Sequence, residues 1–65
     1  MAEVIRVADI RQAGYCVSGI KAWFEARSFN WRSVMRDGVP AEDLLATGDP
    51  MAERAVRMTR ERANG

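Results

Sequence analysis

The sequence predicts an all-α fold, a small bundle of four to five short helices with a longer helix at the C-terminal end. Three observations lead to this prediction. Apolar residues recur at helical spacing, glycines interrupt the chain at intervals that suit short helices, and helix-start signals stand at Asn30 and Asp49. A chain of 65 residues has room for one core, so residues 1–65 are expected to form a single helical domain.

The first helix is expected over residues 7–13, and Gly14 ends it. Three apolar side chains in this segment are spaced three apart, which places them on one helical face. Residues 1–6 are expected to be an extended lead-in. Within that lead-in, Val4 and Ile5 are expected to cover the first helix.

The second helix is expected over residues 19–27, with Ser18 as its N-cap. It holds the strongest core signal in the chain, an i, i+3, i+4, i+7 stripe made of Ile20, Trp23, Phe24 and Arg27. Full burial of a large aromatic side chain contributes roughly 1.5–3 kcal/mol, which is a large share of the stability of so small a domain.

Two short helices are expected next. Asn30 caps the first of them, over residues 31–36, with Trp31, Val34 and Met35 directed inward, and Gly38 follows its end. Proline is well suited to a first helical position, so Pro40 is expected to open the other helix. That helix carries its apolar residues before Gly48, namely Leu44 and Leu45.

The last helix has the best-defined start. Asp49 is a good N-cap and Pro50 suits the first helical position. Good helix formers then continue to Ala63, and the apolar side is expected to consist of Met51, Ala55, Val56 and Met58. Residues 63–65 are expected to fray. A basic edge is formed by arginines three residues apart, Arg54, Arg57 and Arg60.

The chain lacks the residues on which most catalytic sites depend. It has no histidine and a single cysteine, which excludes an intrachain disulfide and a structural zinc site. Cys16 is expected to be mostly buried, with no neighbour that lowers its pKa. The carboxylates of Glu42, Asp43 and Asp49 are better explained by the preference of acidic residues for helix starts. We therefore expect a protein that is not an enzyme and that binds no cofactor.

No apolar run approaches the ~20 residues of a membrane span, and the N-terminal segment lacks the apolar centre of a signal peptide. A single unpaired thiol also suits a reducing compartment. These features predict a cytoplasmic protein without a membrane partner. Small scaffolds often gain stability by self-association, so a homo-oligomer is also compatible with the sequence.

Four segments, DIRQAGYC, GIKAWFEAR, RDGVPAEDLLATGD and AERAV, are together similar to small uncharacterised proteins of tailed bacteriophages and prophages of Gram-negative bacteria. The resemblance covers residues 7–56. It implies a phage protein in the cytoplasm of the bacterial host, with association with the virion as a second option. Small phage proteins of this kind are commonly assembly factors, connectors, regulators or inhibitors of host machinery, and the resemblance implies no catalytic residues.

The leading hypothesis is a protein-binding module that acts as an assembly adaptor or as an inhibitor of a host protein. Its partner is another protein, of the phage or of the host. Aromatic residues and arginine dominate many interfaces, and arginine binds carboxylates in a bidentate manner. The expected partner-binding residues are therefore Phe29, Trp31, Arg32, Arg54, Arg57 and Arg60.

The alternative hypothesis is a helix-turn-helix regulator that binds DNA. The first two helices and the Gly14–Ser18 turn have suitable lengths. The expected recognition helix, however, uses its large apolar residues for the core, and Glu25 would face phosphates. A net charge of +1 also lacks the basic excess that is usual in nucleic-acid binders.

Overall fold

The computed structural model describes residues 3–64 and confirms the predicted fold class. Five helices are present in this range, and the last is the longest. None of them has the length and apolar character that crossing a bilayer requires. In chain order the elements are β1 (Val4–Ile5), α1 (Val7–Gln12), α2 (Val17–Ala26), α3 (Trp31–Asp37), β2 (Val39–Pro40), α4 (Ala41–Ala46) and α5 (Pro50–Asn64).

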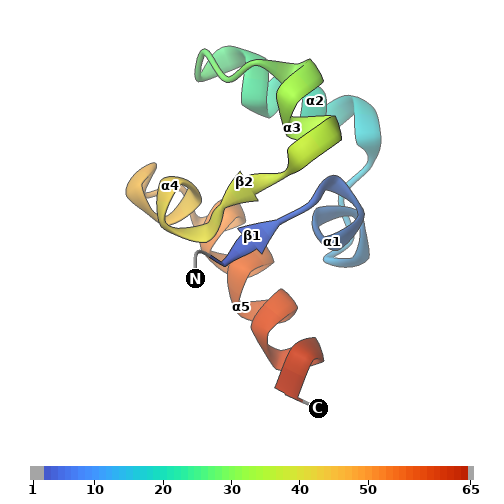
Figure 1. Cartoon of the computed structure of the whole chain (residues 1–65), viewed down its shortest axis with the longest axis vertical. Helices are drawn as coiled ribbons and strands as arrows, with labels where there is room; N and C mark the ends of the chain where they lie inside the picture. Colours follow the sequence, from blue (N-terminus) through green and yellow to red (C-terminus); the bar gives the residue numbers. More distant parts are fainter. Residues whose placement is uncertain (1–2, 65) are drawn as a thin grey trace.

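A two-stranded antiparallel ribbon, which the sequence pattern does not predict, lies at the centre of the molecule (Figure 1). Val4 pairs with Pro40, and Ile5 pairs with Val39. The N–H of Ala41 extends the ladder by donating to the carbonyl of Glu3 over 2.8 Å. Val4 and Ile5 of the lead-in are therefore extended, as expected, but they pair with a strand from the middle of the chain.

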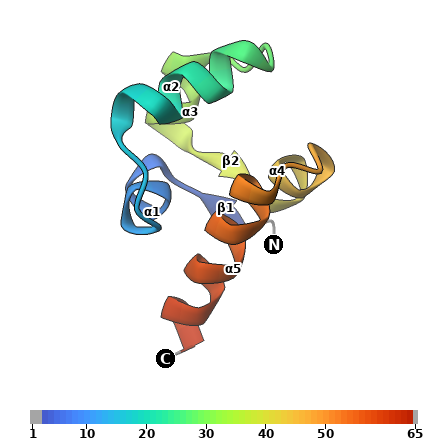
Figure 2. The same ribbon diagram turned by 180° about the vertical axis from the view of Figure 1, so that it is seen from behind.

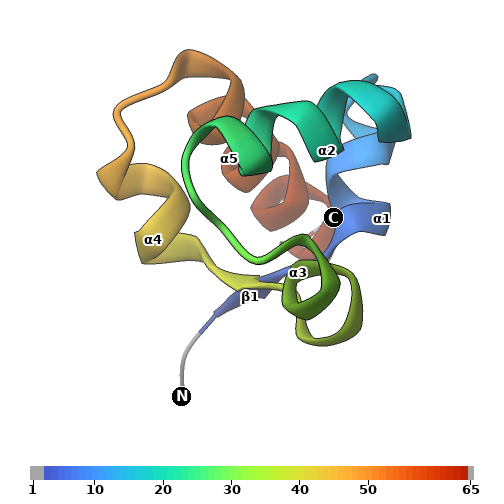
Figure 3. The same ribbon diagram turned by 90° about the horizontal axis from the view of Figure 1, so that it is seen from above.

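The helices surround this ribbon. Seen from behind, α5 crosses the back of the ribbon, with α1 on one side and α4 on the other (Figure 2). The view from above shows α2 lying over this layer with α3 beside it (Figure 3). The packing agrees with these views, because α5 contacts α1 and α4, whereas α2 contacts α1 and α3.

One cluster of apolar side chains forms the core, to which all seven elements contribute. Phe24 is fully buried at an aromatic junction, with its ring centroid 5.0 Å from that of Trp23 and 5.2 Å from that of Phe29. The buried residues are Ile5, Ile10, Ala13, Ile20, Phe24, Val34, Val39, Ala41, Leu44, Ala52, Ala55 and Val56.

Two predicted details of the first helices differ from the structure. The first helix ends at Gln12, and Ala13 is its C-cap. The second helix begins at Val17 rather than Gly19, and its N-cap is Cys16 rather than Ser18. Cys16 has the extended backbone of an N-cap residue, while the Ser18 hydroxyl hydrogen bonds with the Cys16 thiol and caps no backbone N–H.

Two apolar residues of the short helices are exposed, and one of them, Met35, was predicted to point inward. Met35 is 57% exposed and Leu45 is 36% exposed, whereas their neighbours Val34 and Leu44 are buried. Adjacent residues on a helix are about 100° apart, so a helix of one or two turns buries only a narrow stripe. The prediction for Pro40 is also wrong, because Pro40 belongs to β2 and α4 begins one residue later.

The start of α5 is confirmed and its end is longer than predicted. The Asp49 side chain accepts a hydrogen bond from the N–H of Met51 over 2.8 Å, as an N-cap does. The helix continues through Ala63 and Asn64, which were predicted to fray. Ion pairs of Arg60 and Arg62 with the N-terminal part of the chain hold these last turns in place. Met1 and Ala2 of the predicted lead-in, and Gly65 of the predicted tail, lie outside the described residues.

The turn at Gly38 depends on glycine for two separate reasons. Its φ of +79° lies in the left-handed region, which a residue with a Cβ rarely adopts. A Cβ at this position would also lie 2.6 Å from Val4 Cγ1 and 2.9 Å from the carbonyl oxygen of Ile5. The close approach of β1 to β2 therefore requires the hydrogen of glycine.

We expect Gly38→Ala to lower the free energy of unfolding by at least ~2 kcal/mol, since it combines a left-handed backbone with a steric clash. Gly48→Ala is the matched control, because Gly48 has a φ of +71° and no atom within 4 Å of the would-be Cβ. The control should lose only about 1 kcal/mol. Urea denaturation of both variants measures the difference, and equal losses would contradict the packing at Gly38.

Candidate functional site

The predicted aromatic residues lie at the turn between α2 and α3 and belong largely to the core. Phe29 and Trp31 are half-buried, and both rings pack against Phe24. Ser28 has a φ of +64°, which turns the chain so that the N–H of Phe29 donates to the carbonyl of Phe24 over 3.0 Å. This turn therefore directs Phe29 back to the core, whereas Arg32, the third predicted residue of this region, is exposed.

The three predicted arginines on α5 are all exposed, but their surroundings differ. Arg60 forms a bidentate ion pair with Glu3, with its Nη2 and Nε 2.8 and 2.9 Å from Glu3 Oε1. The hydrogen bond from Arg60 lowers the pKa of Glu3, and Glu3 raises the pKa of Arg60 in return. The charge of Arg60 is thus already matched within the chain.

Arg54 and Arg57 keep more of their binding capacity. The Arg54 guanidinium lies 5.7 Å from the centre of the Tyr15 ring, and its Nη1 donates a long hydrogen bond of 3.4 Å to the Tyr15 hydroxyl. Arg57 makes no hydrogen bond or ion pair with any side chain in the described range. The planar guanidinium groups of both residues therefore have donors available for an external acceptor.

The structure does not bring the six predicted residues together. The turn that carries Phe29, Trp31 and Arg32 is at one end of the molecule, between α2 and α3 (Figure 1). α5, which carries the three predicted arginines, runs away from this turn towards the opposite end of the molecule. The residues therefore form two separate surfaces, which we call the aromatic turn (Phe29, Trp31, Arg32) and the α5 edge (Arg54, Arg57).

A shallow groove beside the α5 edge was not predicted from the sequence. It runs along α1 and the connection to α2, is wide open to solvent and has a volume of about 660 Å³. Gly14, which has a φ of +104°, follows the Ala13 C-cap of α1 at this point. We call it the α1–α2 groove, and its lining residues are Ala8, Arg11, Gln12, Gly14, Tyr15, Cys16 and Val17.

Cys16 is exposed in this groove, so the prediction of a buried cysteine is wrong. The prediction of an unperturbed thiol is wrong as well. The Ser18 hydroxyl, 3.6 Å from the sulfur, lowers the pKa of Cys16 most, followed by the N–H of Gly19. Gly19 permits this approach, because a Cβ there would lie only 3.3 Å from the sulfur. The Cys-x-Ser-Gly spacing at a helix start is the sequence signal for this arrangement.

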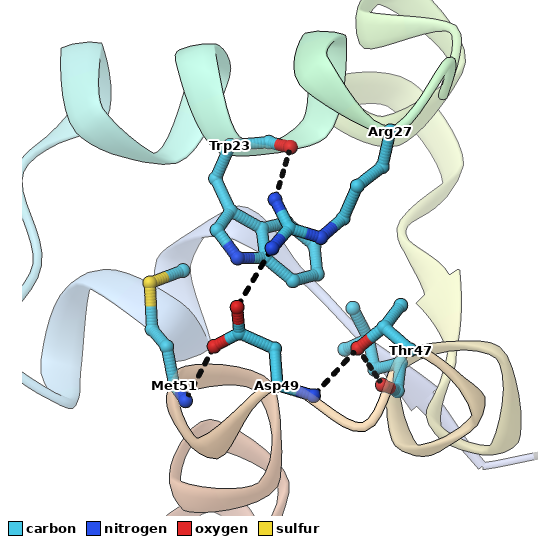
Figure 4. Close-up of polar contacts among 6 residues, drawn as sticks. Trp23, Arg27, Thr47, Asp49 and Met51 are labelled. Carbon is cyan, nitrogen blue, oxygen red and sulfur yellow. Dashed lines mark hydrogen bonds and ion pairs between the residues drawn. The ribbon is translucent and has the colours of Figure 1, made fainter.

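A polar cluster joins the C-terminal end of α2 to the start of α5 (Figure 4). Arg27 Nη2 donates to Asp49 Oδ2 over 2.7 Å, and the same guanidinium lies 4.1 Å from the centre of the Trp23 ring. Arg27 also donates to the carbonyl oxygen of Trp23. Asp49 thus has the structural role that its position before Pro50 predicts, and it gains an ion pair that the local sequence does not reveal.

Four groups lower the pKa of Asp49. The largest contribution comes from the N–H of Met51, followed by the indole N–H of Trp23, the charge of Arg27 and, least among them, the N–H of Ala52. The indole nitrogen is buried near the carboxylate and makes no hydrogen bond of ordinary geometry within residues 3–64. Its dipole still favours the ionised carboxylate, so the cluster is electrostatically matched to a charged Asp49.

The helix pair of the DNA-binding alternative exposes few groups for bases or phosphates. Ile20 and Phe24 are buried and Trp23 is half-buried, as expected for this face of α2. The exposed face of the helix contains Lys21, Ala22, Glu25 and Ala26, so this face carries one positive and one negative charge. In the described range, no group of three or more cysteine, aspartate or glutamate side chains is close enough to hold a metal ion.

The lowered pKa of Cys16 predicts early reaction with iodoacetamide as the pH is raised. The midpoint of the rate profile should lie below the value of about 8.5 for an ordinary cysteine. Ser18→Ala should move the midpoint upward, because it removes the largest stabilising contact of the thiolate. A midpoint at or above the ordinary value in the unchanged protein would contradict the described contacts.

The lowered pKa of Asp49 predicts a specific loss of stability in acid. The folded-state pKa lies below the unfolded value of about 3.9, so the carboxylate contributes stability above that pH, and this contribution is lost as the pH falls through the folded-state pKa. The melting temperature should therefore fall less for Asp49→Asn than for the unchanged protein between neutral pH and about pH 2. Parallel curves, measured by circular dichroism, would contradict this role.

The strongest candidate site therefore combines the α5 edge with the α1–α2 groove, which meet where Arg54 lies against Tyr15. The aromatic turn contributes mainly to the core. Comparisons with protein-family models, with curated proteins and with solved structures found no match to this chain.

Proposed function

We propose that the chain is a non-enzymatic protein-binding module and that the α5 edge is its main contact surface. One observation carries the proposal: Arg54 and Arg57 are exposed neighbours on one side of α5, and no carboxylate in the described range neutralises either of them. Guanidinium groups with available donors are well suited to carboxylates on a partner, because the two groups match in shape and charge.

The rigidity of α5 supports this proposal. Asp49 caps its first turn, and Arg60 and Arg62 tie its last turns to Glu3 and Asp9. A helix fixed at both ends presents its arginines in a defined arrangement before binding. Less conformational entropy is then lost when the complex forms, which favours affinity.

The similarity to small phage proteins supports a phage setting for this module. In that setting it acts in the cytoplasm of a Gram-negative host, either free or attached to the virion. Its partner is then a phage protein, if the chain is an assembly adaptor, or a host protein, if it is an inhibitor. Binding of DNA through α2 is the weaker alternative, because Lys21 and Glu25 carry opposite charges on its exposed face and leave no basic excess there.

The test uses quantitative mass spectrometry on proteins captured by the tagged chain from phage-producing cells. The double variant Arg54→Glu and Arg57→Glu should capture the partner at least about tenfold less well, because like charges then meet at the interface. The matched control is Lys21→Glu with Arg36→Glu, which makes the same charge change on α2 and α3. Circular dichroism checks that both variants are folded.

The proposal fails if the α5 double variant captures the same proteins in the same amounts as the unchanged chain. It also fails if the control variant loses the partner to the same degree, since net charge would then explain the binding. A nucleic acid that stays bound to the chain during washing, and that is lost only in the control variant with Lys21→Glu and Arg36→Glu, would favour the DNA-binding alternative.

A further inference from the structure

We propose that the α1–α2 groove binds an acidic segment of the partner protein, in which carboxylate side chains alternate with small aliphatic ones. The inference rests on the proposed function and adds the chemistry of the partner to it. Three features of the groove support the inference. The groove lies beside Arg54, no acidic side chain lines it, and apolar residues are exposed in it.

The shape of the groove suits a protein segment. Ala8, Arg11 and Gln12 are spaced at three and four residues, so they form one wall along the outer face of α1. The connection to α2 forms the floor, where nothing lies within 4 Å of a would-be Cβ on Gly14. Open space over a glycine lets the backbone of a bound segment approach closely.

The charges of the groove select an acidic occupant. Arg11 is exposed and makes no ion pair with any residue from 3 to 64, and Arg54 places a second guanidinium against the Tyr15 ring at the edge of the groove. The nearest carboxylate in sequence, Asp9, is engaged by Arg62 over 2.7 Å. Complementary charge of this kind favours glutamate or aspartate side chains.

The apolar part of the groove favours a protein over a nucleic acid. Val17 is 39% exposed and lines the groove together with Ala8. These residues can pack against aliphatic side chains of a protein segment, and the phosphates and sugars of a nucleic acid have no such side chains. Two guanidinium groups also neutralise far fewer phosphates than nucleic-acid binding usually requires.

Cys16 makes the proposal directly measurable, because it is the only cysteine of the chain and lies in the groove. The probe is a fluorescein-labelled peptide that contains only glutamate, leucine and alanine. Its binding is followed by fluorescence anisotropy, and its position by the rate at which iodoacetamide alkylates Cys16. A peptide with lysine in place of glutamate and a DNA duplex are the comparison ligands.

We expect the acidic peptide to bind and to slow alkylation of Cys16 several-fold. Arg11→Glu should weaken its binding at least about tenfold, whereas the matched control Arg36→Glu should change binding less than about twofold. The lysine peptide should bind the Arg11→Glu variant, because the charges of both partners are then reversed. Neither the lysine peptide nor the duplex should protect Cys16 in the unchanged protein.

The proposal is overturned if the acidic peptide does not bind, if it binds without protecting Cys16, or if Arg11→Glu binds it normally. Stronger protection by the duplex would also overturn it and would favour a nucleic-acid ligand. The proposed function is tested separately by capture of the cellular partner. If Arg11→Glu captures that partner normally while the α5 double variant does not, the groove inference fails and the protein-binding function stands.

Discussion

The backbone pairing between Val4–Ile5 and Val39–Pro40 fixes the positions of the surrounding helices. α1 begins just after the first strand and α4 begins directly after the second, so the ribbon sets the distance between these two helices. α5 then packs on α1 and α4 behind the ribbon. Ile5 and Val39 are buried in the core, which adds apolar contacts to the few backbone hydrogen bonds of the ribbon.

Features set by neighbouring residues are predictable from the sequence. Asn30 caps α3 by accepting from the N–H of Ser33 over 3.0 Å, and Asp49 caps α5 in a similar way. These contacts span only two or three residues, so the local pattern contains all the information they need. The ribbon is different, because strands of two residues are too short to show an alternating pattern, and their pairing joins distant parts of the chain.

The candidate site shows the same division between local and distant effects. Phe29 and Trp31 are predicted contact residues, and in the fold both rings pack against Phe24 and are half-buried. Arg60 is spaced like Arg54 and Arg57, yet a carboxylate from the opposite end of the chain neutralises it. Helical spacing predicts which arginines share a face. It does not predict which of them find a carboxylate in the folded chain.

The ion pairs of Arg60 with Glu3 and of Arg62 with Asp9 join the two ends of the described chain. All four side chains remain partly open to solvent, so dissolved ions screen both pairs. The attraction within these two ion pairs is therefore strongest in dilute buffer and weaker in concentrated salt, whereas the apolar core is little affected. Experiments on this protein at different ionic strengths therefore compare states that differ in the strength of the ion pairs between α5 and the N-terminal part of the chain.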